Sequence, residues 1–168
     1  MRCPEKVSTC QQASGPVLRR SLDITDIHLQ LTQKNFELEG FEVDLHKADA
    51  ISLPFHDNYF DCVYSFGVLH HIPDVEMVLA EAKRVLKPGG LLQVSVYHIY
   101  SIHTLTLFIR AMVTGKLFRV GVAGVLATIE KGADGNEIKP YVRLYSRHEL
   151  SQLIIACGFK EISTRVVP

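Results

Sequence analysis

The sequence predicts an α/β protein whose doubly wound, mostly parallel sheet is covered by helices on both faces. Two observations support this prediction. Short apolar runs typical of strands alternate along the chain with segments whose apolar residues recur at helical spacing. The apolar runs are nearly continuous, which indicates strands that are covered on both faces, as parallel strands are.

The first half of the chain is expected to contain three strands and one helix. Residues 17–24 are expected to form the first strand. Thr25 is expected to cap a helix that continues to Glu39, because a threonine oxygen can accept a hydrogen bond from the first helical turn. Two further strands are expected at residues 42–47 and 62–66.

The clearest helix follows Asp74, which is expected to cap it. Its apolar residues fall on one face, at positions 75, 78, 79, 82, 85 and 86. The Lys-Pro-Gly-Gly segment at 87–90 is expected to end this helix, because it places a cation at the negative end and then residues that cannot continue a helix. Residues 91–97 are expected to form the fourth strand.

The last third of the chain is less regular. A helix is expected over residues 101–113, after which glycines interrupt the pattern. Ser146 and Glu149 form a capping box for another helix, which Gly158 is expected to end. Residues 161–167 are expected to form the last strand.

The composition is that of an ordinary globular domain. The 168 residues carry 18 basic and 18 acidic side chains, so the net charge is zero, and 47% of the residues are hydrophobic. The high apolar content argues against intrinsic disorder, and the lack of a basic excess argues against nucleic-acid binding. The four cysteines lack C-x-x-C spacing, which favours reduced thiols in a cytoplasmic protein over a zinc site or a disulfide framework.

No membrane span or secretory signal is expected. The longest uncharged run, residues 91–109, contains Gln93, His98 and His103, whose polar groups would be costly in lipid. The first residues lead into serine, threonine and glutamine rather than into an apolar segment.

Two acidic residues stand where strands end and a ligand would bind. Asp23 ends the first strand, where a carboxylate can accept hydrogen bonds from the two ribose hydroxyls of a nucleotide; a helix-capping role is an equal alternative. Asp49 follows the second strand and could accept a hydrogen bond from an adenine amine. Taken alone, Asp49 is better explained as a loop aspartate that forms an Asx-turn.

Three motifs then occur in order. Residues 49–61 read D-A-x-x-L-P-F-x-D-x-x-F-D, residues 69–74 read L-H-H-x-P-D, and residues 84–90 read R-V-L-K-P-G-G. Together they resemble the class I S-adenosylmethionine-dependent methyltransferases, in the subgroup that includes ubiquinone and menaquinone biosynthesis methyltransferases. A nicotinamide-dependent oxidoreductase would share the ribose acid but would not account for L-H-H-x-P-D.

The resemblance implies a Rossmann-like fold, S-adenosyl-L-methionine as the cofactor and methyl transfer to a small-molecule acceptor. It implies that Asp23 binds the ribose and that Ile24 flanks the adenine. The other residues implied to contact the cofactor are Asp49 and Ala50 at the adenine and Ser65, Phe66 and Gly67 beneath the methionine part.

Four side chains beyond the ends of predicted strands are candidates for a general base: His70, His71, Tyr97 and His98. A base helps when the methyl acceptor is a hydroxyl or an amine. The alternative for each residue is an ordinary loop side chain packed against its neighbours. A metal site is disfavoured, because adjacent histidines point in different directions and no third ligand has suitable spacing.

One part of the family pattern has no counterpart. The family carries a G-x-G-x-G loop before the ribose acid, whereas a single glycine, Gly15, precedes Asp23 here. We therefore expect residues 1–168 to form one methyltransferase-like domain that is truncated at its N-terminus and begins inside the first helix. Without the central first strand, a sheet edge would be open, which predicts either a fragment or a homodimer that covers the edge.

Two alternatives remain open at this point. The chain could be a non-catalytic methyltransferase-like remnant that acts through oligomerisation or surface binding. Residues 99–140 could form an insert on the substrate side, with the glycine-punctuated stretch 101–125 covering the acceptor pocket as a lid or forming an ordinary core helix.

Overall fold

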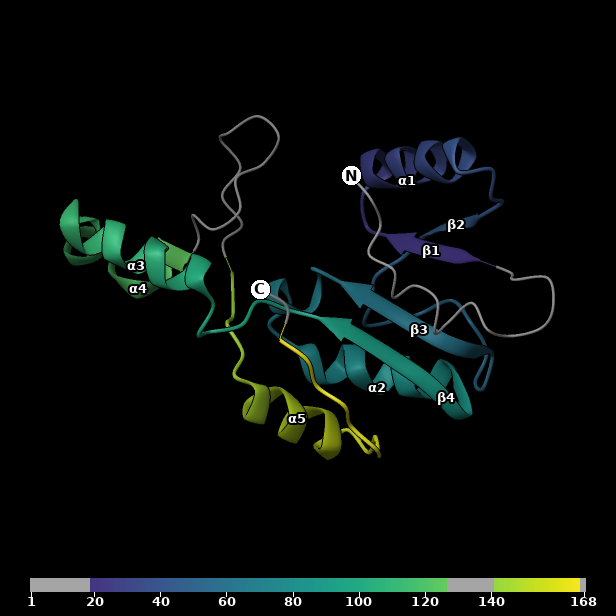
Figure 1. Ribbon diagram of the computed structural model, residues 1–168. Coiled ribbons are helices and arrows are strands. Elements are labelled where there is room, and N and C mark those ends of the chain that lie inside the picture. The colour runs from purple at the N-terminus through teal and green to yellow at the C-terminus, as the bar shows by residue number, and fades with distance from the viewer. Residues whose placement is uncertain (1–18, 127–140, 167–168) are drawn as a thin grey trace. The chain divides into compact units, whose positions relative to one another are not determined.

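The computed structural model describes residues 19–126 and 141–166 (Figure 1). The chain divides into two compact units. Unit 1 comprises residues 1–63 and 80–92, and unit 2 comprises residues 64–79 and 93–168. The described residues form parallel strands and helices in alternation, so the predicted α/β class is confirmed.

Unit 1 begins with a strand, a helix and a second strand. Strand β1 (Arg20–Asp23) is parallel to β2 (Asp44–Lys47), and helix α1 (Asp26–Leu38) connects them and contacts both. In this register Arg20 pairs with Asp44 at the start of the strands, and Asp23 pairs with Lys47 at their ends. The carboxyl ends of both strands therefore lie at the same edge.

Helix α1 starts and ends close to its predicted bounds. Thr25 occupies the N-cap position, but its side chain makes no capping hydrogen bond, so that part of the prediction is wrong. At the other end, the backbone N–H of Phe41 donates to the carbonyl of Phe36 at 2.9 Å. This closing hydrogen bond needs the left-handed conformation at Gly40, whose φ is 72°.

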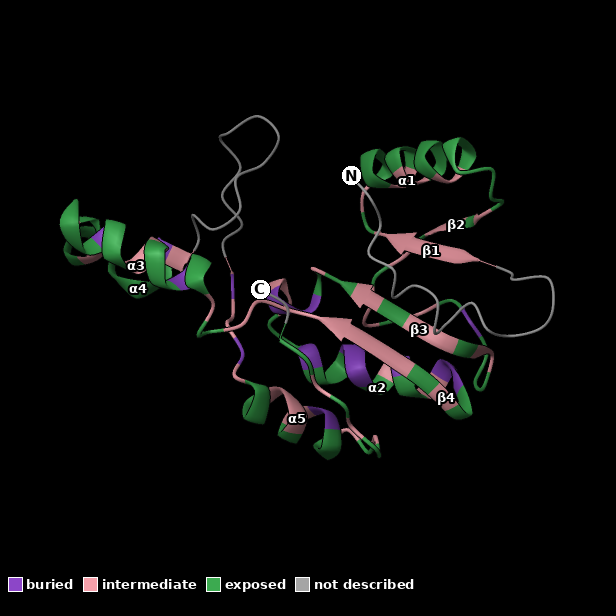
Figure 2. Ribbon diagram, in the orientation of Figure 1, coloured by how far each residue is buried: buried purple, intermediate pink, exposed green. Residues whose placement is uncertain are grey.

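A second pair of strands follows, and both run in the same direction (Figure 1). Strand β3 spans Phe60–Phe66, helix α2 spans Val75–Val85 and strand β4 spans Leu86–Ser95. The apolar stripe predicted for α2 is confirmed: all six of its positions, including Leu86 just beyond the helix, are less than 9% exposed (Figure 2).

Helix α2 ends earlier than the Lys-Pro-Gly-Gly signal predicts. Strand β4 begins directly after the helix, at Leu86 rather than at the predicted residue 91. The cause is tertiary: the carbonyls of Arg84 and Val85 accept hydrogen bonds from the backbone N–H groups of Asn58 and Tyr59 at 3.0 and 2.8 Å. Backbone hydrogen bonds to the segment before β3 therefore replace the helical hydrogen bonds at the end of α2.

The described residues of unit 2 include a short 3₁₀ helix (Leu69–His71) and, after β4, the helices α3 (Ile102–Val113), α4 (Lys116–Leu126) and α5 (Arg147–Ala156). Ser101 caps α3 by accepting a hydrogen bond from the N–H of Thr104 at 3.1 Å. Ser146 caps α5 in the same way, accepting from the N–H of Glu149 at 3.1 Å. Helix α4 was not predicted, and it accommodates Gly121 by a kink where φ is 70°.

Two sequence-based expectations fail in the described residues. Residues 161–166 form no strand, and Glu161 adopts a φ of 55°, which turns the backbone out of the extended conformation that a strand needs. Cys62 is disulfide-bonded rather than a reduced thiol. Among the helices that the structure describes, none has the length and apolar character needed to cross a membrane.

Candidate functional site

The edge of unit 1 where β1 and β2 end brings together the residues predicted to bind adenosine. The backbone N–H of Ala48 donates to the carbonyl of Asp23 at 3.2 Å, which continues the parallel pairing one residue past β2. Asp49 is the next residue along the chain. Asp23 and Ile24 therefore share this edge with Asp49 and Ala50, as the sequence predicts for the carboxyl ends of adjacent parallel strands.

The carboxylate of Asp23 is held in a fixed position. Its Oδ1 accepts hydrogen bonds from the backbone N–H of Thr25 at 2.8 Å and from the Thr25 hydroxyl at 2.7 Å. Its Oδ2 lies 3.3 Å from Nδ1 of His28. A carboxylate has about four acceptor positions, so Oδ2 retains the capacity to accept from a further hydroxyl.

The contacts of Asp23 keep it ionised. Partial burial by itself would raise the pKa of Asp23, but the two hydrogen bonds from Thr25 and the nearby His28 outweigh it, and the pKa is lowered. Asp23 is therefore an oriented anion at the end of β1. Asp23 also forms a turn with Thr25 just before α1, which is close to the helix-capping role that the sequence analysis offered as an alternative.

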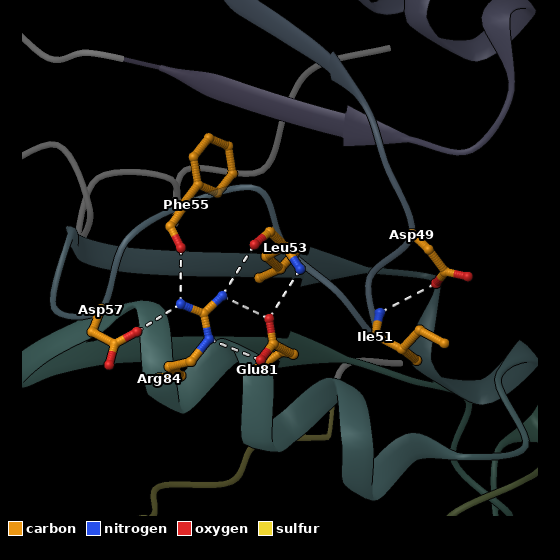
Figure 3. Close-up of polar contacts among 7 residues, drawn as sticks. All are labelled: Asp49, Ile51, Leu53, Phe55, Asp57, Glu81 and Arg84. Atoms are coloured by element: carbon orange, nitrogen blue, oxygen red, sulfur yellow. Dashed lines mark hydrogen bonds and ion pairs between the residues drawn. The ribbon is translucent and has the colours of Figure 1, made fainter.

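Asp49 and Ile24 complete the edge. Oδ1 of Asp49 accepts a hydrogen bond from the backbone N–H of Ile51 at 3.2 Å, which is the Asx-turn considered from sequence (Figure 3). The side chain of Asp49 is exposed, and Ala50 is half-buried. Ile24 is 63% exposed, an uncovered apolar surface directly beside the oriented carboxylate of Asp23.

Arg84 joins helix α2 to the loop that follows Asp49, an arrangement that we call the Arg84 clamp (Figure 3). Its guanidinium donates to both carboxylate oxygens of Glu81, at 2.8 and 2.7 Å, and to Oδ1 of Asp57 at 2.7 Å. It also donates to the carbonyls of Phe55 and Leu53, at 2.8 and 3.0 Å. Glu81 in turn accepts a hydrogen bond from the N–H of Leu53 at 2.9 Å.

The Arg84 clamp explains part of the motif signal in physical terms. The leucine, phenylalanine and second aspartate of the first motif are the residues that the guanidinium holds, and Arg84 is the first residue of the third motif. These positions shape the loop after Asp49. Hydrogen bonds to the carboxylates raise the pKa of Arg84, so its charge is permanent.

Replacing Arg84 with methionine is expected to lower the melting temperature of the chain by roughly 5 °C or more. The change leaves two carboxylates and two carbonyls without their donor. Differential scanning fluorimetry measures the shift. The matched control is Lys87→Met, which removes an exposed ion pair to Asp61 (2.8 Å) and is expected to change the melting temperature by less than about 2 °C. Equal shifts in the two variants would contradict the clamp.

The clamp also predicts acid sensitivity. Hydrogen bonds from Arg84 lower the pKa of Glu81 below its ordinary value of 4.5, against the opposing effect of burial. A carboxyl whose pKa is lower in the folded state stabilises the fold above its unfolded pKa, and this contribution disappears as the pH falls through the folded value. Melting temperatures measured between pH 7 and pH 3 should therefore fall less in Glu81→Gln than in the unsubstituted chain. The exposed Glu76→Gln on the same helix should retain the full pH dependence.

In unit 2, the residues predicted to lie under the methionine part of the cofactor end β3. The backbone N–H of Gly67 donates to the carbonyl of Ser95 at 3.1 Å, which ties the end of β3 to the end of β4. Gly67 has a φ of 71°, and no atom lies within 4 Å of the position that a Cβ would occupy. Phe66 is 63% exposed and Ser65 is half-buried. The turn is thus open on the side where a larger residue would project.

His70 and His71 lie in the 3₁₀ helix and have different environments. His70 is 1% exposed, and its ring centre lies 4.1 Å from that of His71 and 4.4 Å from that of Tyr97. His70 is therefore packed against its neighbours, which is the alternative to a general base that the sequence analysis considered. His71 is only half-buried, and its Nδ1 lies 3.0 Å from the carbonyl oxygen of Tyr141.

The Tyr141 carbonyl fixes the tautomer of His71. A carbonyl only accepts hydrogen bonds, so Nδ1 carries the proton and Nε2 is the basic nitrogen of the neutral ring. His98 differs, since its Nδ1 accepts a hydrogen bond from the backbone N–H of Tyr100 at 3.3 Å. Of the four candidates for a general base, His71 therefore has the geometry that best suits the role.

Tyr145 is a residue that the sequence analysis did not identify. Its side chain is 1% exposed, and its hydroxyl is buried with no hydrogen-bond partner among the described residues. Its backbone N–H donates to the carbonyl of Tyr97 at 3.0 Å, and the Arg143 guanidinium lies 5.0 Å from its ring centre. Burial raises the pKa of Tyr145 despite the nearby cation of Arg143, so the phenol is neutral and able to donate. Only tertiary packing could have identified this residue.

The predicted site residues thus fall into two sets. Unit 1 holds those expected at the adenosine, and unit 2 holds Ser65, Phe66, Gly67 and the four candidates for a base. In the part of the chain that the structure describes, no three histidine, cysteine or acidic side chains are grouped so that they could hold a metal ion.

A comparison with protein families matches residues 14–94 to the methyltransferase domain. Curated relatives include the ubiquinone/menaquinone biosynthesis C-methyltransferase UbiE of Teredinibacter turnerae, 45% identical over 43% of this chain and 30% of that protein. The UbiE of Serratia proteamaculans is 38% identical over 49% of this chain and 39% of that protein. The phthiotriol/phenolphthiotriol dimycocerosates methyltransferase of Mycobacterium tuberculosis is 37% identical over 45% of this chain and 27% of that protein. The chain therefore spans about a third of the length of the curated relatives it matches.

Solved structures show the same fold. A SAM-dependent methyltransferase from Aquifex aeolicus has a TM-score of 0.58 at 15% identity and covers 92% of this chain and 65% of its own. The [4+2]-cyclase SpnF has a TM-score of 0.61 at 19% identity and covers 94% of this chain and 48% of its own. The Rossmann-like fold is confirmed by this likeness, and the cyclase illustrates that the fold alone does not fix the reaction.

Proposed function

We propose, from the match of residues 14–94 to the methyltransferase domain, that the protein transfers a methyl group from S-adenosylmethionine to a small-molecule acceptor. The observation that carries the proposal is the parallel register of β1 and β2, which pairs Asp23 with Lys47. This register brings the oriented carboxylate of Asp23 to the same edge as Asp49.

The chemistry of this edge fits the adenosine half of the cofactor. The ionised carboxylate of Asp23 would accept a hydrogen bond from a ribose hydroxyl. Asp49 would accept from the adenine amine, and the exposed side chain of Ile24 would pack on the apolar ring. Bound there, the cofactor would supply an activated methyl group on its sulfonium.

We assign the acceptor end of the reaction to unit 2. His71 would take a proton from the acceptor at Nε2, because the Tyr141 carbonyl holds the other ring nitrogen in its protonated form. The buried hydroxyl of Tyr145 would donate to the acceptor and so orient it. His70 would position His71 through its ring contact, and Tyr97 would support His70 in turn, without either touching the acceptor.

The class of acceptor is suggested by the relatives, whose names specify ubiquinone and menaquinone biosynthesis. We therefore propose a small organic acceptor, with a quinone precursor as the first to test. The zero net charge of the chain disfavours a nucleic acid.

The experiment incubates the chain with S-adenosylmethionine labelled in its methyl group and with a quinone precursor. Time-dependent label in the organic extract, lost when excess S-adenosylhomocysteine is added, would support the proposal. If S-adenosylhomocysteine binds in calorimetry but no label is transferred to any small acceptor tried, the chain is a cofactor-binding protein and the proposed catalysis is wrong.

We also propose that two copies of the chain pair along an open sheet edge. Within residues 19–126 and 141–166, β1 pairs only with β2 and β3 only with β4, so each of these sheets has open edges. Unpaired strand edges favour association with another strand. Light scattering coupled to size exclusion would give the mass of a dimer, and a monomer at all concentrations would refute the pairing.

A cytoplasmic location is the last part of the proposal, and it is supported by the use of a nucleoside cofactor. The disulfide at Cys62 opposes it, because disulfides are rare in reducing compartments. Titration of free thiols in the unfolded chain, isolated from cells with its thiols blocked, decides the matter. Four free thiols would agree with the cytoplasm, and two would contradict it.

A further inference from the structure

Helix α3 has apolar side chains on two opposite sides. One side is buried or half-buried and includes Ala111, and α4 packs against the helix. The other side follows i, i+3, i+7, i+10 and i+11 spacing and is 52 to 82% exposed; it consists of Ile102, Leu105, Ile109, Met112 and Val113. The packing of the described residues of unit 2 does not cover this second apolar side.

Helix α4 extends the same kind of surface. Phe118 is 82% exposed, Val120 is 49% exposed and Val122 is 55% exposed. The kink at Gly121 lies between the last two of these residues. The exposed apolar residues of α3 and α4 together form what we call the hairpin surface. Apolar exposure on this scale marks an interaction site.

The charges of the hairpin all have one sign. Residues 101–126 contain Arg110, Lys116 and Arg119, all exposed, and no aspartate or glutamate, although the whole chain is neutral. A hollow of about 350 Å³ lies at the start of α4 and is lined by Thr114, Lys116, Arg119 and Val120. Two cations and a hydroxyl around one hollow suit the phosphate of a lipid headgroup.

We propose that the hairpin surface docks on an anionic phospholipid membrane. A helix of about 12 residues is about 18 Å long at 1.5 Å per residue, too short to cross a bilayer core of about 30 Å, so the hairpin would lie in the membrane interface. Its apolar side chains would enter the acyl boundary, and its cations would contact headgroup phosphates. The inference is independent of the proposed methyl transfer.

Sedimentation with sucrose-loaded vesicles tests the proposal on the full chain. Binding to vesicles of phosphatidylcholine with a third phosphatidylglycerol should be at least tenfold tighter than binding to phosphatidylcholine alone. The apolar variant Leu105→Gln/Ile109→Gln and the charge variant Lys116→Gln/Arg119→Gln should each weaken binding at least tenfold. The charge variant changes only exposed side chains and therefore keeps the test valid if the apolar variant melts early.

Matched controls change equally exposed residues elsewhere. Leu31→Gln/Leu38→Gln alters two exposed leucines of α1, and Arg147→Gln/Lys160→Gln removes two exposed cations. Both controls should bind within about twofold of the unsubstituted chain. Three outcomes would overturn the proposal: no vesicle binding, equal binding to both kinds of vesicle, or a dimer in solution that dissociates in the apolar variant. The third outcome would assign the hairpin surface to a second copy of the chain.

Discussion

Replacing Asp23 with alanine is expected to weaken the binding of S-adenosylhomocysteine by at least about tenfold. The change removes the ionised acceptor for a ribose hydroxyl, and a hydrogen bond to a charged group is worth about 1.5–3 kcal/mol. The low pKa of Asp23 means that this acceptor is charged at neutral pH. Isothermal titration calorimetry measures the dissociation constant.

Two further variants separate binding from local structure, because Asp23 also holds the turn at Thr25. Thr25→Val removes the hydroxyl that donates to Oδ1 at 2.7 Å but leaves the carboxylate in place, so affinity should stay within about threefold. Asp23→Asn keeps a neutral acceptor and should fall between the other two. If Asp23→Ala binds as tightly as the unsubstituted chain, the assignment of the ribose to this residue is wrong.

Replacing His71 with alanine is expected to reduce kcat for methyl transfer by at least about a hundredfold, the lower end of what a general base contributes. Affinity for S-adenosylhomocysteine should not change, because His71 is not among the residues proposed to bind adenosine. Transfer of labelled methyl under saturating cofactor measures kcat.

The variant His71→Gln distinguishes a base from a positioning residue. Glutamine can still donate a hydrogen bond to the Tyr141 carbonyl but cannot accept the proton of the acceptor. A general base predicts equal losses in His71→Gln and His71→Ala, whereas recovery of most activity by glutamine would contradict that role. The exposed His148→Gln on α5 is the matched control and should leave kcat unchanged.

The fold was predictable where local patterns agree with packing. The apolar stripe of α2 and the serine cap of α5 are local signals, and the structure confirms them. Helix α4 was missed because its glycines suggest a break, whereas a kink at Gly121 accommodates the change of direction. The predicted last strand failed because a strand needs a partner, which a single segment of sequence does not reveal.

The site was predictable only in part. Asp23 and Asp49 were identified from their positions after strands, and the register of β1 and β2 brings them to one edge. The sequence could not distinguish His71 from His70, because their difference in burial arises from contacts with residues near 97 and 141. Nor did the motifs reveal that Arg84 and its partners hold a loop. A motif identifies a family, and the contacts determine what each residue does.

The most direct test of the account follows backbone amide signals of the labelled chain by NMR as S-adenosylhomocysteine is added. The central claim is that adenosine binds where β1 and β2 end. It predicts the largest shift changes at Thr25, Ala48 and Ile51, whose N–H groups hydrogen-bond to Asp23 or Asp49 at that edge. Unchanged signals at these three amides, under conditions where the ligand binds, would contradict it.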